Sequence, residues 1–150
     1  MSRWHHHFHL VWATKCRQPL LTPQKEEVVF RIALEIAQRY GYELLAINGM
    51  PDHVHLLLSI GPKMDLSAFV KHIKGSSSAL LNDMTDHNSR FRWQEGYYSA
   101  TITPSHLPKV LAYIQNQKEH HAAGTTDAYW EETGETENGP VWKNPDAESG

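Results

Sequence analysis

The segment YELLAINGMPDHVHLLLSI, residues 42–60, carries the strongest structural signal in this 150-residue chain. Its two parts, 42–49 and 53–60, are aliphatic runs of the kind that form strands, and the Met-Pro-Asp tripeptide at 50–52 turns the chain between them. In the second part every even-numbered residue is aliphatic, and side chains alternate between the two faces of a strand. The segment therefore predicts a tight β-hairpin whose second strand turns one apolar face to the core.

Further strands and helices are predicted on both sides of this hairpin. Residues 23–40 have the apolar spacing of an amphipathic helix, with Thr22 as its N-cap and Gly41 just past its end. The remaining predicted elements are a strand at 6–14, a helix from Asp65 or Ser67 to about Met84, a strand at 97–102 and a helix at about 106–121. The order β-α-β-β-α-β-α predicts an α+β, two-layer ferredoxin-like sandwich, an antiparallel sheet with helices on one face. The other face is then free for a site or a partner.

Length and composition indicate one ordinary domain with a packed core. Hydrophobic residues make up 40% of the chain and charged residues 21%, which excludes a fully disordered protein. The sequence has no apolar run of the about 18 residues that a membrane span needs and no signal-peptide core, so we expect a soluble, cytoplasmic protein. The single Cys16 excludes an internal disulfide framework and a zinc site built from several cysteines.

Charge is distributed unevenly along the chain. The formal net charge is −3, but residues 125–150 hold seven acidic residues and one lysine, which leaves ten acidic and thirteen basic residues in 1–124. A mildly basic body is compatible with nucleic-acid binding without demonstrating it. The acidic end also contains several glycines and prolines, which is typical of a flexible segment. We therefore predict a folded domain at 1–124 and an acidic C-terminal tail at 125–150.

His53 and His55 of the predicted hairpin point to the face opposite the aliphatic residues. Neighbouring side chains on one face of a strand lie about 6.5–7 Å apart, close enough for two imidazoles to bind one ion. Imidazole is a common ligand of divalent transition metals. A His-x-His pair also arises by coincidence on protein surfaces, but the Pro-Asp turn before it and the apolar opposite face favour a metal site.

Tyr113 and Gln117 are four residues apart in the helix predicted at 106–121, so they lie on the same side of it. A phenolate can attack phosphorus, and an amide oxygen can help to hold the metal ion that polarises the phosphate. Because the unperturbed pKa of tyrosine is about 10, this chemistry needs a nearby cation that favours the phenolate. The same pair also fits a tyrosine at the core boundary beside a solvated glutamine.

Together, the two motifs resemble a known protein family. Met50-Pro51-Asp52-His53-Val54-His55-Leu56-Leu57 is similar to the HUH motif, in which U is a bulky apolar residue, and Tyr113-Ile114-Gln115-Asn116-Gln117 is similar to the tyrosine helix of the same family. The family is that of the small single-tyrosine HUH transposases of bacterial insertion sequences, with their relatives associated with repetitive extragenic palindromes. The resemblance covers about residues 4–121.

The resemblance implies a role for each matched residue. His53, His55 and Gln117 would bind a divalent metal ion, Mg2+ or Mn2+, and Tyr113 would attack single-stranded DNA. The attack would leave a 5′-phosphotyrosine link and a free 3′-OH, and strand transfer would follow without a nucleotide cofactor. Members of the family are typically homodimers that recognise DNA hairpins at the ends of the element, and the tyrosine of one chain can serve the histidines of the other. Because two imidazoles suit a softer ion than Mg2+, we expect Mn2+ to work as well or better.

Basic and aromatic residues outside these motifs are candidates for DNA contact. The basic candidates are Arg17, Lys71, Lys74, Arg90 and Arg92, and the aromatic candidates for base stacking are Trp93, Tyr97 and Tyr98. Because side chains alternate along a strand, at least one of Tyr97 and Tyr98 must face the core. His120 and His121 lie near the tyrosine face and either tune the site or interact with the helix C-terminus. Two other functions stay open: a non-catalytic module that binds single-stranded nucleic acid, and a metal-dependent phosphodiesterase that uses water.

Overall fold

The structure is a computed structural model that describes residues 6–84, 90–127, 130–131 and 141–142. Its strands are β1 (His6–Ala13), β2 (Glu43–Met50), β3 (His53–Ile60), β4 (Tyr98–Ile102) and β5 (Val141–Trp142). Its helices are α1 (Pro23–Tyr40), α2 (Leu66–Met84), α3 (Leu107–Gln115) and α4 (Gln117–Ala123), with a short 3-10 helix at Lys15–Arg17. Within the described ranges, none of the helices has the length and apolar character needed to span a membrane.

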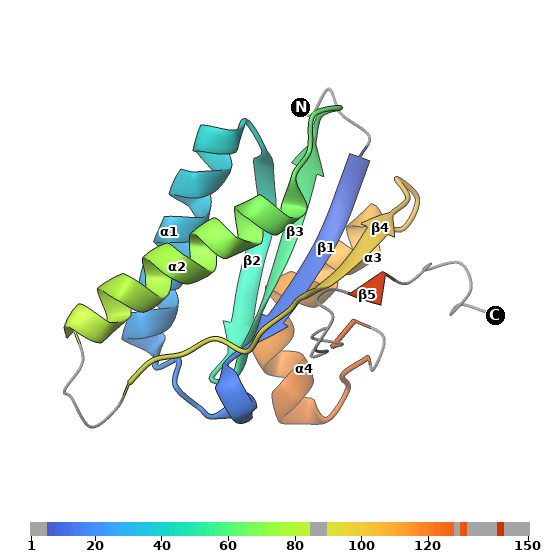
Figure 1. Cartoon of the computed structure of the whole chain (residues 1–150). Coiled ribbons are helices and arrows are strands. Elements are labelled where there is room, and N and C mark those ends of the chain that lie inside the picture. Colours follow the sequence, from blue (N-terminus) through green and yellow to red (C-terminus); the bar gives the residue numbers. More distant parts are fainter. Residues whose placement is uncertain (1–5, 85–89, 128–129, 132–140, 143–150) are drawn as a thin grey trace.

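The sheet has the strand order β2-β3-β1-β4-β5 (Figure 1). β3 pairs antiparallel with β1 and β2, and β1 pairs antiparallel with β4, which is the ferredoxin-like arrangement expected from the sequence. β5 adds two residues parallel to β4. α1 and α2 lie together on one face of the sheet (Figure 1). The predicted fold class is confirmed.

The main core lies between the sheet and the layer formed by α1 and α2. The even-numbered side chains of β3 are buried there with apolar residues of both helices: Val54, Leu56, Leu58, Ile60, Val29, Ala33, Ile36, Phe69 and Ile73. α1 begins and ends where the sequence predicts. The Thr22 side chain accepts a hydrogen bond from the backbone N of Lys25 (3.3 Å), and Gly41 has a φ of +71°, which glycine adopts without strain.

α3 and α4 lie against the other face of the sheet, behind it in Figure 1. A second apolar cluster joins Leu57 of β3 and Ile102 of β4 to Val110 and Ile114 of α3. His53 and His55 belong to the same sheet face as Leu57, because side chains alternate along β3. The two histidines are therefore enclosed by the C-terminal helices rather than open to solvent.

The helix predicted at 106–121 is divided into α3 and α4 at Asn116, whose φ of −101° and ψ of 24° interrupt the helical path. Tyr113 belongs to α3 and Gln117 is the first residue of α4. Both side chains nevertheless face the sheet. The ring centroid of Tyr113 lies 6.2 Å from that of His55, and Gln117 Nε2 lies 3.4 Å from His53 Nε2.

Only part of the predicted tail at 125–150 belongs to the described residues. Its last described residues form β5 at Val141–Trp142. Its first ones approach α3, where the backbone N of Asp127 donates to the hydroxyl of Tyr113 (2.9 Å). Residues 128–129, 132–140 and 143–150 lie outside the described residues.

Candidate active site

His53 and His55 lie side by side at the start of β3, where β1 and β2 pair with both edges of the strand. Their ring centroids are 5.2 Å apart, and the residues are 1% and 0% exposed. The Nε2 atoms of both rings point to one oxygen, Glu131 Oε1, at distances of 2.9 Å and 3.3 Å. The alternation of the strand thus brings two imidazole nitrogens to one point.

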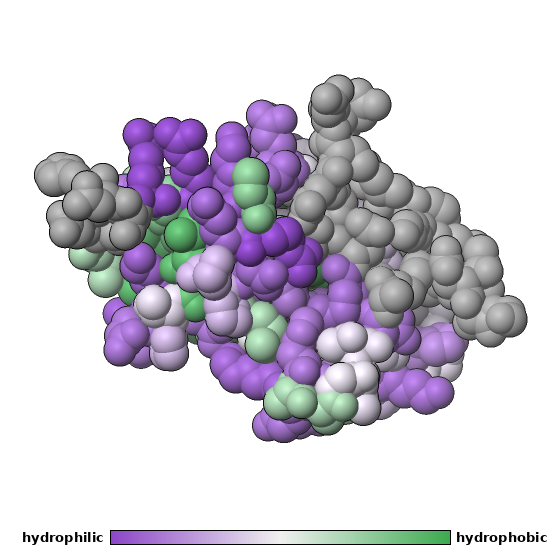
Figure 2. Space-filling view, turned by 90° about the horizontal axis from the view of Figure 1, so that it is seen from below, coloured by the Kyte–Doolittle hydropathy of each residue, from purple (hydrophilic) through white to green (hydrophobic). Residues whose placement is uncertain are grey.

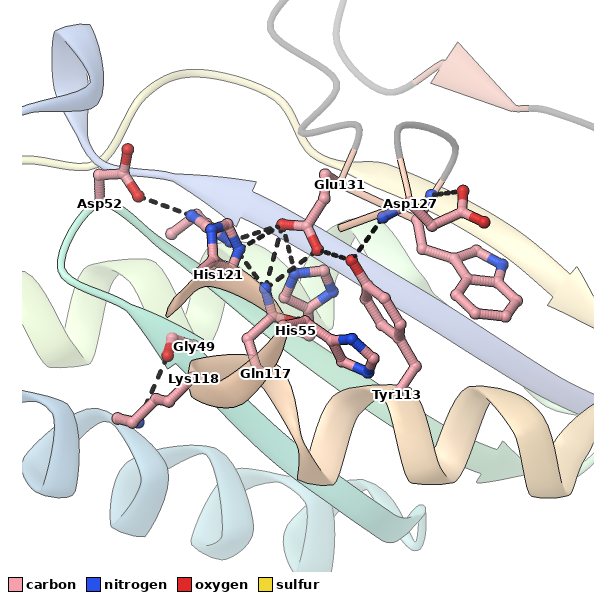
Figure 3. Close-up of polar contacts among 12 residues, drawn as sticks. Gly49, Asp52, His55, Tyr113, Gln117, Lys118, His121, Asp127 and Glu131 are labelled. Atoms are coloured by element: carbon pink, nitrogen blue, oxygen red, sulfur yellow. Dashed lines mark hydrogen bonds and ion pairs between the residues drawn. The ribbon is translucent and has the colours of Figure 1, made fainter. Parts of the chain in front are cut away.

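α3 and α4 bring Tyr113 and Gln117 to the same point. Gln117 Nε2 lies 3.4 Å from Nε2 of His53 and donates to Glu131 Oε2 (3.0 Å). The hydroxyl of Tyr113 donates to the same Oε2. The structure therefore gathers the four residues singled out by the two motifs into one site around Glu131. Figure 3 shows three of them, His55, Tyr113 and Gln117, beside this carboxylate.

Glu131 is at the centre of this site, although neither sequence motif contains it. Its Oε1 faces the histidines and lies 2.9 Å from Nε2 of His121, whereas its Oε2 faces Tyr113. The carboxylate thus bridges the imidazole half and the phenol half of the site (Figure 3). Glu131 follows Gln117 by 14 residues and is one of seven acids in the tail, so no periodicity connects it to the motif. The only signal that could have found it is the local excess of histidines, which favours a nearby carboxylate.

Three further residues hold the phenol ring of Tyr113 in place. His120 stacks on it with ring centroids 4.5 Å apart, and Trp130 packs at 4.8 Å at a steep angle. The backbone N of Asp127 donates to its hydroxyl (2.9 Å). Of the two histidines after the tyrosine motif, one therefore stacks on the phenol and the other contacts Glu131.

Hydrogen bonds and burial together shift the pKa of both groups that face each other across the site. Burial would raise the pKa of Glu131, but hydrogen bonds from His53 and His55 outweigh it and hold that pKa far below its usual value. Burial, and then the hydrogen bond to Glu131, raise the pKa of Tyr113. The carboxylate is therefore ionised and the phenol neutral in this arrangement.

The two histidines differ in their affinity for a proton. Burial lowers the pKa of His55 to about 4, and Glu131 opposes this only in part. Burial also acts on His53, but hydrogen bonds to Asp52 and Glu131 outweigh it and raise the His53 pKa. His53 Nδ1 lies 2.6 Å from Asp52 Oδ1. Burial would raise the pKa of Asp52, but the interactions with His53 and Arg17 outweigh it and lower this pKa to about 2. A carboxylate behind an imidazole orients the ring for metal binding.

The donor set fits a divalent metal ion. One ligand atom each of His53, His55 and Glu131 lies within 4.8 Å of the others. Gln117 Oε1 is buried and has no hydrogen-bond partner among the described residues. A half-turn of this amide exchanges Oε1 with Nε2 and points an oxygen at the histidines. Two imidazoles combined with oxygen donors suit an ion such as Mn2+.

The five basic candidates for DNA contact fall into two groups. Lys71, Lys74, Arg90 and Arg92 line a groove of about 630 Å³ beside α2. Within it the ammonium of Lys74 donates to the carbonyls of Gln94 (2.8 Å) and Gly96 (2.6 Å), and burial lowers its pKa to about 8. Arg17 lies beside the histidine site instead, with its Nε 3.1 Å from Asp52 Oδ2.

The groove and the histidine site meet at the end of β1. The backbone N of Thr14 donates to the carbonyl of Asp52 (2.9 Å), and that of Lys15 donates to the carbonyl of Arg92 (3.0 Å).

Figure 2 views the molecule from below, the end that carries the 3-10 helix and α4 in Figure 1. The coloured residues of this face are largely hydrophilic, with small, separate hydrophobic patches.

Two of the three aromatic residues considered for base stacking are in the interior. Tyr97 is 8% exposed and Tyr98 is 0% exposed, so neither ring is at the surface for base stacking, and the expectation that at least one of them faces the core is met by both. Tyr98 clusters with Val11 and Ala100 on the sheet face that was expected to be open. Trp93 is partly buried, and its indole donates to Ser77 Oγ (2.9 Å).

Comparisons with known proteins agree with this geometry. The family model described as "Transposase IS200 like" matches residues 2–117. The transposase for insertion sequence element IS200 of Salmonella typhimurium is 30% identical over 128 residues, which cover 82% of this chain and 84% of the relative. The ISDra2 transposase TnpA of Deinococcus radiodurans is 30% identical over 118 residues, 73% of this chain and 82% of the relative.

A solved structure supports the fold. It is that of a REP-associated tyrosine transposase bound to a REP hairpin, and it superposes with a TM-score of 0.62. The match covers 84% of this chain and 76% of the other at 16% identity. The arrangement of strands and helices is therefore shared with a transposase of distant sequence.

Proposed function

This chain belongs to the family of IS200-like transposases, and we propose that it acts on single-stranded DNA with Tyr113 as the nucleophile. The proposal rests on one observation: the Tyr113 hydroxyl and the Nε2 atoms of His53 and His55 converge on one carboxylate, that of Glu131. A nucleophile and a set of metal ligands that meet around one small anion are placed to act on one phosphate.

The carboxylate of Glu131 indicates where a DNA phosphate would bind. One of its oxygens faces the histidines and the other accepts the phenol proton in a hydrogen bond. A phosphate also carries negative oxygens on one central atom, so it would use the same donors. For DNA to contact both halves of the site, Glu131 has to leave this position.

In the proposed reaction the phenol oxygen of Tyr113 attacks the phosphorus of a phosphodiester. A bond forms between that oxygen and phosphorus, the bond from phosphorus to the 3′ oxygen breaks, and the released 3′-OH finally carries the phenol proton. A 3′-OH later attacks the 5′-phosphotyrosine, which restores the phenol and joins the strand. Because the covalent link retains the phosphate ester, strand transfer needs no nucleotide cofactor.

His53, His55 and Gln117 would hold a divalent ion, Mn2+ or Mg2+, and Glu131 offers a further ligand atom before DNA binds. When bound, the ion would polarise the phosphate and favour the phenolate form of the tyrosine. The chain itself orients the reacting groups. Asp52 holds the ring of His53, and the stacking of His120 holds the phenol.

We infer that the DNA strand reaches this site along the groove lined by Lys71, Arg90 and Arg92. The three side chains would each neutralise one phosphate, which gives a slope of about −2 for the logarithm of affinity against the logarithm of salt concentration. The resemblance further suggests hairpin-bearing element ends as the DNA and a homodimer as the assembly. Within this single chain the four motif residues already lie together, so the proposed reaction uses Tyr113 and the histidines of the same chain.

The test is to incubate the full chain and Mn2+ with a 3′-labelled single strand that carries a hairpin. We expect a labelled adduct that survives denaturation, is absent in Tyr113→Phe, and persists in Tyr40→Phe, a control substitution in α1. Tight binding without an adduct would instead indicate a non-catalytic module. Cleavage that persists in Tyr113→Phe would indicate a phosphodiesterase that uses water. Either result contradicts the proposal.

A further inference from the structure

A third buried histidine, His9 of β1, lies directly behind His55. Its Nε2 is 2.9 Å from Nδ1 of His55, and the two rings are stacked with centroids 5.1 Å apart and planes inclined by 16°. Both residues are 0% exposed. The contact follows from the register of the sheet, because His55 pairs with Val11 and His9 is the next residue of β1 on the same face.

The bonding rules of neutral imidazole determine what this contact does when His55 binds a metal ion. A neutral ring has one nitrogen with a proton and one with a free lone pair. If Nε2 of His55 binds the ion, its proton must be on Nδ1, and that N–H points at His9. Nε2 of His9 must then be the acceptor, and the proton of His9 must be on its own Nδ1.

We propose that His9 is a positioning residue that accepts the Nδ1 proton of His55, and so holds the ring in place, when Nε2 of His55 binds a metal ion. This inference rests on the proposed function, because it takes His55 to be a metal ligand. Asp52 orients the ring of His53 in a similar way, but its acceptor is a partly exposed carboxylate. The two rings of the HUH motif are thus oriented by different acceptors, one charged and one neutral.

The surroundings of His9 explain why a neutral acceptor stands at this position. A carboxylate here would be fully buried, and an isolated buried charge is costly. The other contacts of the ring are the stack on His55 and an edge contact with Tyr98, with ring centroids 6.1 Å apart. Nδ1 of His9 has no hydrogen-bond partner among the described residues. The contact with His55 is therefore the one hydrogen bond of His9 that the described part of the chain provides.

The test compares three substitutions in metal-free full-length protein without DNA. His9→Phe keeps a stacked ring but removes the acceptor, and we expect Mn2+ affinity, measured by calorimetry, to fall about 10–100-fold. His9→Gln restores an acceptor oxygen and should recover most of this loss. His7→Phe, two residues away on the same face of β1, is the matched control for a buried phenyl ring and should change the affinity less than about twofold.

A spectroscopic measurement reports the tautomer itself. In wild-type protein with 15N-labelled histidine, loading with diamagnetic Zn2+ should give His55 the nitrogen shifts of the Nδ1–H tautomer, and His55→Ala identifies the resonance. Mn2+ affinity of a folded His9→Phe within twofold of the wild type would overturn the proposal, and so would an Nε2–H tautomer of His55 with Zn2+ bound. If His9→Phe does not fold, the test rests on the wild-type spectrum and on His9→Gln, whose Mn2+ affinity should stay close to that of the wild type. If wild-type protein binds no Mn2+, or His55→Ala binds it equally well, the proposed metal site fails as well.

Discussion

Replacing Glu131 with glutamine tests whether this carboxylate controls the acidity of Tyr113. Burial, and then the hydrogen bond to Glu131, raise the pKa of Tyr113. Glutamine keeps an acceptor oxygen in a side chain of the same size but removes the negative charge. Because a nearby negative charge disfavours the phenolate, the substitution should lower the pKa of Tyr113.

The size of the effect follows from the kind of hydrogen bond that is exchanged. A hydrogen bond to a charged group contributes about 1.5–3 kcal/mol and one between neutral groups about 0.5–1.5 kcal/mol. The substitution therefore removes roughly 1–1.5 kcal/mol of preference for the protonated phenol. Because 1.36 kcal/mol corresponds to a factor of ten in a protonation equilibrium, the phenolate population at a given pH should rise about tenfold. Tyr113 is only 5% exposed, so solvent does little to screen the change.

The assay is an NMR titration of protein labelled with 13C at the tyrosine Cζ, without metal or DNA. Tyr113→Phe identifies the resonance of interest among the six tyrosines of the chain. Glu119→Gln is the matched control, because it removes the same charge from an exposed position of α4. Control of Tyr113 by the charge of Glu131 is contradicted if Tyr113 titrates at the same pH in Glu131→Gln and in the wild type, or if Glu119→Gln produces an equal shift.

Four more substitutions, two of them a matched pair of glycine changes, test other parts of the molecule. Asp52→Asn removes the charged acceptor behind His53 and should weaken Mn2+ binding about 10–100-fold in calorimetry, and an unchanged affinity would show that the carboxylate does not orient the ring. Gly49→Ala places a Cβ against the carbonyl of His53 and should lower the free energy of unfolding by about 1–3 kcal/mol in urea. In the matched change Gly75→Ala the added Cβ meets open space in α2, so the free energy of unfolding should rise by about 0.5–1 kcal/mol. Equal effects of Gly49→Ala and Gly75→Ala would contradict the predicted clash at Gly49. Lys71→Ala should reduce the steepness of the salt dependence of single-stranded DNA binding by about 0.7, and an unaltered slope would remove Lys71 from the DNA path.

The histidine pair could be predicted from the sequence because the alternation of a strand is a local property. The aliphatic even-numbered residues of β3 fix which face packs against α1 and α2, and His53 and His55 then have only the other face. The proximity of Tyr113 and Gln117 could also be predicted, although Asn116 divides the helix between them. A single irregular residue leaves the two side chains on the same side, because both donate to Glu131 Oε2.

Relations between distant segments could not be predicted in the same way. The apolar stripe of 106–121 indicates that this helix packs on something, but it does not say which face of the sheet. α3 in fact packs on the face of Leu57. Tyr98 is buried in a separate cluster with Val11 and Ala100. The contact of Glu131 with His55 joins residues 76 positions apart, and no periodicity or motif links them.

The charges of the site explain how a proton and a metal ion would compete for it. Asp52 and Glu131 are held ionised, whereas burial keeps His55 neutral by lowering its pKa to about 4. His53 is the ring with the raised pKa, and a proton on its Nε2 faces the carboxylate of Glu131. An ion that binds this Nε2 has to displace that proton, because a metal ligand must offer its lone pair. If His53 holds the ion as proposed, proton and ion would therefore compete for its Nε2.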